Sequence, residues 1–498
     1  MEAKCNILKK ENLSCLLQPE TLAGFQPLKE ETNTRLILRG HLANSKEGLI
    51  IKIFKRPHFF DQVKYLFRPP RSRKEWQISQ KLSHLGIPTP SLVAYVALRR
   101  SCFLTKDLVV FREISNVEPL INWIEKNFIQ KTLPLSERKK VVRTLGGFVR
   151  KIHDRGIFSN DFHQGNILIK TEPGKPPLFY LSDLHAIRVK KELTLQERIK
   201  NLSQFNNFRI PVSDRMRFLS AYLQAGGLKG VSKKTLAKEI ASVSFTHWGH
   251  LWQKRKKRSL RPGKGLKAFE VGPWKGMSRE EFFLENSFPF FDWLSSEFKG
   301  TGSFAKEVLY PENGKSLIIR YYKQTNFFSH LKTVGALSPA KRAWVIIHNL
   351  IMRGIPTVSP VAFGEKKRCG ILQHCFIAYK KIPEEKPNLF SLSELLTKTS
   401  FEENPSLKKE FLFKLARLIR WMHQTGVSIK GMNAGDFWMT LHNEKISLFL
   451  GDWQGITIEK TVGRHEVAQE LKMIGTGVLE TFSRAEQDFF LKIYSRRK

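Results

Sequence analysis

The amino-acid sequence predicts an α+β fold built as two tandem bilobal domains, each with a small β-rich lobe followed by a helical lobe. Three observations predict it. In the first half, strand-like runs come first and amphipathic helical patterns follow. The second half repeats this order of segments. The length of 498 residues also exceeds what one ordinary hydrophobic core holds. We expect the two domains at residues 1–268 and 269–498.

The small lobe of the first domain is predicted from two apolar runs. Residues 1–30 are expected to form a short helical extension. The runs RLILRG, from residue 35, and LIIKIFK, at 49–55, indicate two strands joined by a polar turn at 41–48. Lys52 lies inside the second strand. A lysine among apolar strand residues either has a partner in the interior or only snorkels at the sheet edge.

A helix is predicted next, between the prolines that flank residues 71–87. Glu75 falls on its apolar stripe, because isoleucine and leucine residues follow it at spacings of three, four and three. A carboxylate that points inward needs a cation, and Lys52 on the neighbouring strand is the natural one. The alternative is a glutamate at the rim of the stripe.

The helical lobe is predicted from the segments that follow. Residues 91–113 supply further strand-like sequence and end the small lobe. Residues 135–153 have the pattern of an amphipathic helix, and two more helices are indicated at QERIKNLSQFNN and SDRMRFLSAYLQA. Between the first of these helices and the other two, residues 158–183 are expected to form a loop and a hairpin, with a carboxylate at the end of the hairpin.

That loop and hairpin carry the candidate chemistry. Asp161 precedes Asn166 by five residues, and Asp183 follows the second apolar run of the hairpin. Phosphoryl transfer from ATP needs one carboxylate to orient the attacking hydroxyl, and a carboxylate with an amide oxygen to hold magnesium. The three residues have the order and spacing of a kinase catalytic loop and metal strand. Taken singly, each is more often a turn or cap residue.

A kinase site assigns roles to the small lobe as well. Lys52 is expected to hold the ATP phosphates, and Glu75 to hold Lys52. Together with Asn166 and Asp183, these residues are the candidate cofactor-binding set, while Asp161 is the candidate catalytic residue. The turn at 41–48 has no GxGxxG pattern, so its grip on phosphates is expected to be loose.

The internal repeat provides a control for these assignments. LIIKIFK matches LIIRYYK, and IHDRGIFSNDFHQGNILI matches MHQTGVSIKGMNAGDFWM. The apolar stripes persist in the second copy while most polar groups change, so the second domain is expected to be a pseudokinase that transfers no phosphate. Whether it binds nucleotide stays open; GTGSFAKEV at 300–308 is a fair glycine-rich turn. The matched positions are Lys52 with Arg320, Glu75 with Ala343, Asp161 with Gly431, Asn166 with Asp436, and Asp183 with Asp452.

Composition narrows the compartment and the partners. Five scattered cysteines without a CxxC pair indicate neither a disulfide framework nor a zinc site, so a reducing cytoplasm fits. No run of 18 apolar residues and no signal-peptide pattern is found, so we expect a soluble protein or one bound to a membrane surface. The net charge of +39 favours polyanionic partners. The alternative is a general preference for lysine.

The most basic stretch is residues 254–267, with eight basic residues and no acidic one, preceded by Trp248 and Trp252. It indicates either a solvated linker or a contact with anionic lipid, with tryptophan at headgroup level. Nucleic acid is not expected as a partner, because neither aromatics interleaved with basic residues nor a reading helix is found.

The run FSNDFHQGNILI with YLSD, the helix exit EWQISQKLSHLGIPTP, and the segments NLSQFNNF and SDRMRFLSAY resemble the lipopolysaccharide core kinase family. The resemblance implies a protein-kinase-like fold in each copy. It also implies an ATP- and Mg²⁺-dependent enzyme that phosphorylates a heptose or Kdo hydroxyl of an anionic, lipid-linked glycan at the cytoplasmic face of the inner membrane. The competing hypotheses are a non-catalytic tandem pseudokinase scaffold, and a kinase for a protein or another small molecule. The oligomeric state is not predicted.

Overall fold

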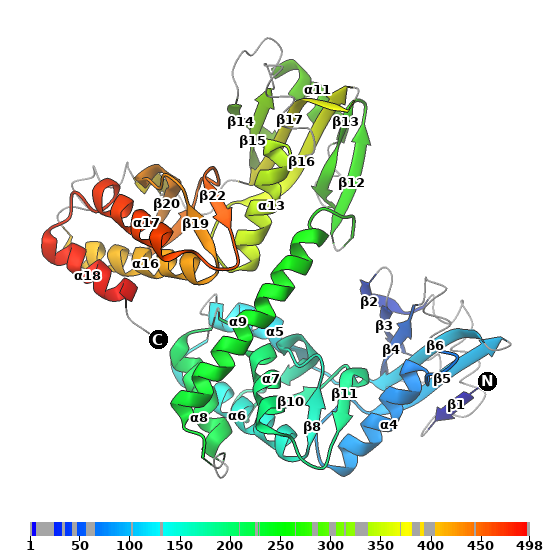
Figure 1. Ribbon diagram of the computed structural model, residues 1–498. Helices are drawn as coiled ribbons and strands as arrows, with labels where there is room; N and C mark the ends of the chain where they lie inside the picture. Colours follow the sequence, from blue (N-terminus) through cyan, green and yellow to red (C-terminus); the bar gives the residue numbers. More distant parts are fainter. Residues whose placement is uncertain are drawn as a thin grey trace. The chain divides into compact units, whose positions relative to one another are not determined.

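The computed structural model combines helices and sheets in two compact units, Met1–Trp248 and Gly249–Lys498, which are described separately (Figure 1). The division falls within helix α9 (Lys233–Arg258), and the boundary expected after residue 268 falls inside strand β12 (Leu266–Val271). The structure describes residues 2–5, 24–31, 35–41, 47–55, 65–100, 103–129, 133–208, 210–224, 228, 230–263, 265–280, 287–297, 305–312, 315–323, 337–368, 370–380, 389–392, 404–442 and 445–495.

The first unit begins with a six-stranded sheet in the order β1-β5-β6-β4-β3-β2. The helical extension expected over residues 1–30 is wrong for the described part, where β1 and β2 are strands that pair with β5 and β3. The predicted strand pair is confirmed as β3 and β4, with Ile37 opposite Lys52. The six strands are β1 (Glu2–Cys5), β2 (Gln26–Glu31), β3 (Arg35–His41), β4 (Gly48–Phe54), β5 (Leu92–Arg100) and β6 (Phe103–Arg112).

Helix α4 (Arg71–His84) confirms the helix predicted between the prolines, and it packs beside this sheet (Figure 1). Its first turn is fixed from the sheet, because the buried carboxylate of Asp107 accepts hydrogen bonds from the main-chain N–H groups of Arg71 (3.1 Å) and Ser72 (3.2 Å). Trp76 anchors the helix by packing on Tyr95, with ring centroids 5.5 Å apart. The helix is therefore held at a fixed rotation against the strands.

The remainder of the first unit is mainly helical. The predicted amphipathic helix is α6 (Leu135–Asp154), and its apolar face is buried in the core of this part of the unit. The two helices indicated after residue 183 are α7 and α8. The other elements are β7 (Val117–Pro119), α5 (Leu120–Ile124), β8 (Ile157–Ser159), β9 (Ile167–Lys170), β10 (Leu178–Leu181), β11 (Ile187–Val189), α7 (Leu195–Phe205) and α8 (Val212–Gln224).

The second unit repeats the same plan. Its sheet has the order β12-β13-β16-β17-β15-β14, so β15 lies between the partners that match those of β4. One hydrogen bond recurs at matched positions: the main-chain N–H of Leu181 donates to Pro88 O (2.9 Å), and that of Leu450 donates to Pro356 O (2.8 Å). The repeat read from the sequence is therefore also a repeat of main-chain structure.

The elements of the second unit are β13 (Trp274–Arg279), α11 (Ser287–Glu297), β14 (Ala305–Glu312), β15 (Lys315–Lys323), α13 (Pro339–Met352), β16 (Ser359–Arg368), β17 (Ile371–Lys380), β18 (Leu389–Ser391), α16 (Pro405–Gln424), β19 (Val427–Ile429), β20 (Phe437–His442), β21 (Lys445–Leu450), β22 (Ile456–Ile458), α17 (Arg464–Gly477) and α18 (Arg484–Ser495). Within the described ranges, no helix combines the length and the apolar character that crossing a bilayer requires.

Candidate active site

Lys52 and Glu75 form a buried ion pair between the sheet and helix α4. The Lys52 Nζ lies 2.6 Å from Glu75 Oε1, and the two side chains are 7% and 0% exposed. Strand alternation turns Lys52 away from Ile51, which faces the sheet core, and helical spacing turns Glu75 toward the strands. The removal of two charges from water is costly, so the pair needs close geometry and further partners. The inward orientation predicted for Glu75 is confirmed.

Asp183 brings a second carboxylate to the same ammonium. Its Oδ1 lies 2.6 Å from Lys52 Nζ, and its side chain is 10% exposed. The backbone of Asp183 is left-handed, with φ 57° and ψ 60°, a conformation that an L-residue other than glycine adopts rarely. This conformation, just after β10, changes the direction of the chain and turns the Asp183 side chain toward Lys52. Lys52, Glu75 and Asp183 thus meet in one cluster, although the chain separates them widely.

Asp161 and Asn166 lie on the loop between β8 and β9. The Asn166 Nδ2 donates to the main-chain oxygen of Asp161 (2.9 Å), and the N–H of Ser182 donates to the main-chain oxygen of Asn166 (2.9 Å). These bonds tie the loop to the residue before Asp183. Because its Nδ2 is engaged, the Asn166 side chain has its Oδ1 as the atom that can accept or ligate. All five predicted site residues therefore belong to one connected region.

The Asp161 carboxylate is 64% exposed, and His163 Nε2 lies 3.5 Å from its Oδ2. The His163 Nδ1 accepts a hydrogen bond from the N–H of Gly165 (3.0 Å), so a proton on the neutral ring lies on Nε2, facing Asp161. The hydrogen bond from His163 is the main reason that the pKa of Asp161 is lowered. An ionised, exposed carboxylate can accept a hydrogen bond from a hydroxyl group.

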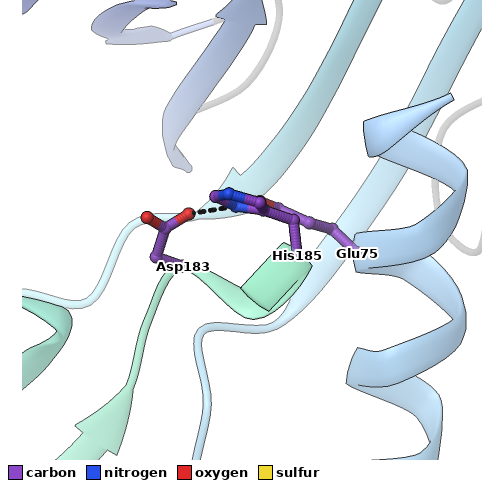
Figure 2. Close-up of side chains that lie close together, drawn as sticks. All are labelled: Glu75, Asp183 and His185. Atoms are coloured by element: carbon purple, nitrogen blue, oxygen red, sulfur yellow. Dashed lines mark hydrogen bonds and ion pairs between the residues drawn. The ribbon is translucent and has the colours of Figure 1, made fainter. Parts of the chain in front are cut away.

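His185 is a member of the cluster that the sequence did not identify. Its Nδ1 lies 2.6 Å from Asp183 Oδ1 and 3.4 Å from Glu75 Oε1. Figure 2 shows Glu75 reaching from α4 toward the short segment that carries Asp183 and His185. Burial disfavours the charged imidazole, but the hydrogen bonds to both carboxylates raise the pKa of His185. The available signal was its position two residues after Asp183.

Burial also opposes ionisation of Asp183. The hydrogen bond from His185 and the charge of Lys52 outweigh that effect and hold the pKa of Asp183 well below its ordinary value. Arg35 is the second member that the sequence did not identify: its Nη1 lies 3.0 Å from Asp183 Oδ2. Both oxygens of Asp183 therefore contact cationic or protonated nitrogen groups.

The donor set of the site fits a divalent cation. Oxygen and nitrogen atoms of Glu75, Asp183 and His185 lie within 4.8 Å of one another, and the buried Glu75 Oε2 has no hydrogen-bond partner among the described residues. Asn166, whose main-chain oxygen is bonded to the N–H of Ser182, offers an amide oxygen on the neighbouring loop. Carboxylate and amide oxygens are the ligands that Mg²⁺ prefers, whereas imidazole nitrogen suits transition metals better. The side chains of Asn166 and Asp183 are therefore the ones that suit Mg²⁺.

The strand ladder locates the turns that border the site. Gly48 is four residues from Lys52, about 13 Å along an extended strand, and pairs with His41 at the far end of the hairpin. Arg35, at the other end of β3, reaches Asp183. The end of the β3–β4 hairpin that reaches the site is therefore the one at Arg35, whereas His41 and Gly48 pair at the opposite end. Residues 32–34, 42–46 and 301–304, the last from the glycine-rich turn of the second copy, lie outside the described residues.

The matched region of the second unit is built differently. Arg320 keeps a cation beside a carboxylate, with Nη1 3.0 Å from Asp452 Oδ1, and its guanidinium lies 4.5 Å from the ring centroid of Trp453. Ala343 is buried in the apolar core where Glu75 stands in the first unit. Asp452 Oδ1 also accepts hydrogen bonds from the N–H groups of Trp453 (2.7 Å) and Gln454 (3.1 Å), so this carboxylate caps its own loop.

The catalytic-loop positions also differ between the two units. Gly431 has φ +75° where the first unit has Asp161, and it provides no side chain. Asp436 Oδ2 accepts from the N–H of Asn433 (2.8 Å), which closes the loop on itself. Burial is the main cause of a raised pKa at Asp436. The polar set of the first unit is therefore not reproduced among these residues.

Comparisons with known proteins identify the family of the chain. A solved structure described as "WaaP in complex with acyl carrier protein" aligns with 17% identity and a TM-score of 0.36, over 53% of this chain and 100% of that chain. The search of curated proteins found no match. The model of the Lipopolysaccharide kinase (Kdo/WaaP) family matches residues 30–222 and again residues 320–494. Since the two matches together span well over half of the sequence, the chain belongs to the Lipopolysaccharide kinase (Kdo/WaaP) family.

Proposed function

We propose that the chain is a tandem of two bilobal kinase-like domains, of which the first transfers a phosphoryl group from Mg-ATP to a heptose or Kdo hydroxyl of the lipopolysaccharide core. The observation that carries the proposal is the buried cluster in which Lys52 lies 2.6 Å from both Glu75 and Asp183. Family membership supports a kinase, and the cluster supplies the lysine, glutamate and aspartate that a kinase site requires.

In the proposed reaction, Asp161 accepts a hydrogen bond from the attacking sugar hydroxyl and orients it. Lys52 binds the nucleotide phosphates, while Glu75 fixes the position of Lys52. Asn166 and Asp183 hold the magnesium ion, which neutralises the charge of the phosphates when it is bound. Most of the rate enhancement is then expected from positioning and charge neutralisation rather than from proton removal.

The second domain is proposed to have a regulatory or scaffolding role. It has Gly431 in place of the orienting carboxylate and Ala343 in place of the lysine-holding glutamate. Asp452, the retained carboxylate, is bonded to its own loop. This difference supports a division of labour in which the first domain reacts and the second domain does not.

A location on the cytoplasmic face of the inner membrane is part of the proposal, since the acceptor is lipid-linked and anionic. Residues 254–258, at the end of α9, are basic and exposed. The tryptophans beside them are engaged within the fold: Trp252 is buried and donates to Met352 O (3.2 Å), and the partly buried Trp248 donates to Asn206 O (3.2 Å). A membrane contact at this segment therefore depends mainly on lysine and arginine, each contributing roughly 1 kcal/mol near anionic lipid.

The proposal is tested with purified full-length protein, Mg-ATP and lipopolysaccharide core lacking phosphate, with mass spectrometry of the product. We expect phosphate transfer that is lost in Asp161→Ala and Asp183→Ala and little changed in Asp452→Ala. Equal loss in Asp452→Ala would contradict the roles given to the two domains. Transfer to a protein or another small molecule, but not to core glycan, would support the alternative kinase. A stably folded protein that transfers no phosphate to any acceptor would support the non-catalytic pseudokinase scaffold.

A further inference from the structure

Arg35 occupies a position that the five predicted residues do not explain. It begins β3 directly after the connection between β2 and β3, and its ladder partner is Phe54, two residues beyond Lys52. Its Nη1 reaches Asp183 Oδ2 at 3.0 Å, across 148 residues of sequence. The Arg35 side chain is 21% exposed, so the guanidinium lies at the mouth of the buried cluster rather than within it.

The charges around Asp183 explain why a second cation at this position matters for nucleotide binding. Lys52 already contacts both carboxylates of the cluster, Glu75 and Asp183, so its ammonium is strongly compensated. A nucleoside triphosphate carries several negative charges. A single lysine that is already compensated by two carboxylates cannot neutralise them all. Arginine presents a planar fork of donors that matches the oxygens of a phosphate group. Arg35 is the second permanent cation that contacts Asp183.

The sequence of the connection that precedes Arg35 contains no glycine. Residues 32–34 are threonine, asparagine and threonine, without the glycines that let main-chain N–H groups approach a phosphate closely. A side chain that reaches in from the adjoining strand can supply the missing donors. Arg35 is the first residue after that connection.

The second unit shows what the fold does without this residue. The pair Arg35 and Phe54 corresponds to Ala305 and Tyr322, because Phe54 and Tyr322 are matched by the repeat and each is the ladder partner in its own unit. Alanine has no guanidinium. At this matched position the second unit therefore has no cationic side chain, and the same unit has glycine at the position of Asp161, while a similar strand pairing remains. A purely structural role in the ladder would not require arginine.

We propose that Arg35 is a phosphate-binding residue, which donates hydrogen bonds to non-bridging phosphate oxygens of the nucleotide in place of glycine-loop amides. This inference rests on the proposed function. When Arg35 donates to a phosphate group, it leaves Asp183 Oδ2, and that oxygen becomes available to a divalent cation. Arg35 therefore couples nucleotide binding to cation binding, and each is expected to strengthen the other.

The test is calorimetric titration of the full-length protein with ATP, ADP and adenosine, with and without Mg²⁺. Arg35→Met, which retains an apolar stem, is expected to weaken ATP binding about ten- to a hundred-fold and to leave adenosine binding unchanged. It is also expected to reduce the gain in ATP affinity that Mg²⁺ provides. Arg35→Lys is expected to recover part of the loss, because a point charge without the fork remains.

The matched control is Arg39→Met. Arg39 lies on the same strand, is 52% exposed and pairs with Glu113 at 2.7 Å. Its loss is therefore expected to leave the affinities for ATP and for adenosine unchanged. Tight ATP binding that Arg35→Met does not alter would overturn the inference and leave the proposed function standing. Equal weakening of ATP and adenosine binding, with a lower melting temperature, would overturn it in favour of a structural role. Absence of ATP binding by the unmodified protein would refute both.

Discussion

Glu75→Gln separates the electrostatic role of the buried glutamate from its volume. The amide has nearly the size of the carboxylate, so helix α4 keeps its packing against the sheet while one negative charge is removed. Glu75 is 0% exposed, and its Oε1 is 2.6 Å from Lys52 Nζ. After the change, Lys52 retains Asp183, also at 2.6 Å, as its remaining charged partner.

The expected magnitude follows from those contacts. Removal of one partner from a fully buried ion pair costs about 3–5 kcal/mol of unfolding free energy, because the other charge is left uncompensated. Here Asp183 still compensates Lys52, so we expect a smaller cost of about 1.5–3 kcal/mol, the range for one hydrogen bond to a charged group. Activity is expected to fall much further, about 100-fold, because Lys52 is drawn toward Asp183 and away from the phosphates.

The assay is urea unfolding followed by circular dichroism, together with phosphate transfer measured on the same samples. The double variant Lys52→Met with Glu75→Leu serves as the control, because two apolar side chains leave no unpaired charge at these positions. It is expected to be more stable than Lys52→Met alone and to be inactive. Strictly additive losses of stability in Lys52→Met, Glu75→Leu and their combination, or full activity in Glu75→Gln, would refute the reasoning.

Two further predictions concern stability. Burial and the nearby Arg198 lower the pKa of His153 to about 3, below its ordinary value of 6.5, so the unfolded chain binds a proton that the folded unit does not. The unfolding free energy is therefore expected to fall with decreasing pH between these values, by about 1.4 kcal/mol per pH unit from this group. Chemical unfolding at pH 7.5 and 5.0 measures this fall. The same dependence of the unfolding free energy on pH in His153→Gln would contradict the assignment. Trp344→Phe is expected to cost more stability, by about 1 kcal/mol, than Trp76→Phe, because Trp344 Nε1 donates to Ser259 O (2.7 Å) whereas Trp76 Nε1 has no partner among the described residues. Equal shifts in the unfolding midpoints of the two units would argue against it.

Periodicity and internal repetition carried the sequence analysis a long way. The stripe on residues 71–84 oriented Glu75 correctly, because helical spacing is a local property that neighbouring residues determine. The hairpin after Asp161 and the helix predicted over residues 135–153, observed as Leu135–Asp154, were found for the same reason. The helix expected over residues 1–30 failed in the described part, where pairing with distant strands outweighs a weak local pattern.

The sequence alone determined the duplicated plan, the helix that presents Glu75, and the contrast between a polar first copy and a depleted second one, since all three depend on spacing along the chain. Three features became visible only in the folded chain: Arg35 and His185 join the cluster, Asp183 adopts a left-handed backbone, and Trp252 is buried. These features depend on contacts between residues far apart in the chain and on the backbone direction at a strand's end. No local pattern of residue types encodes either.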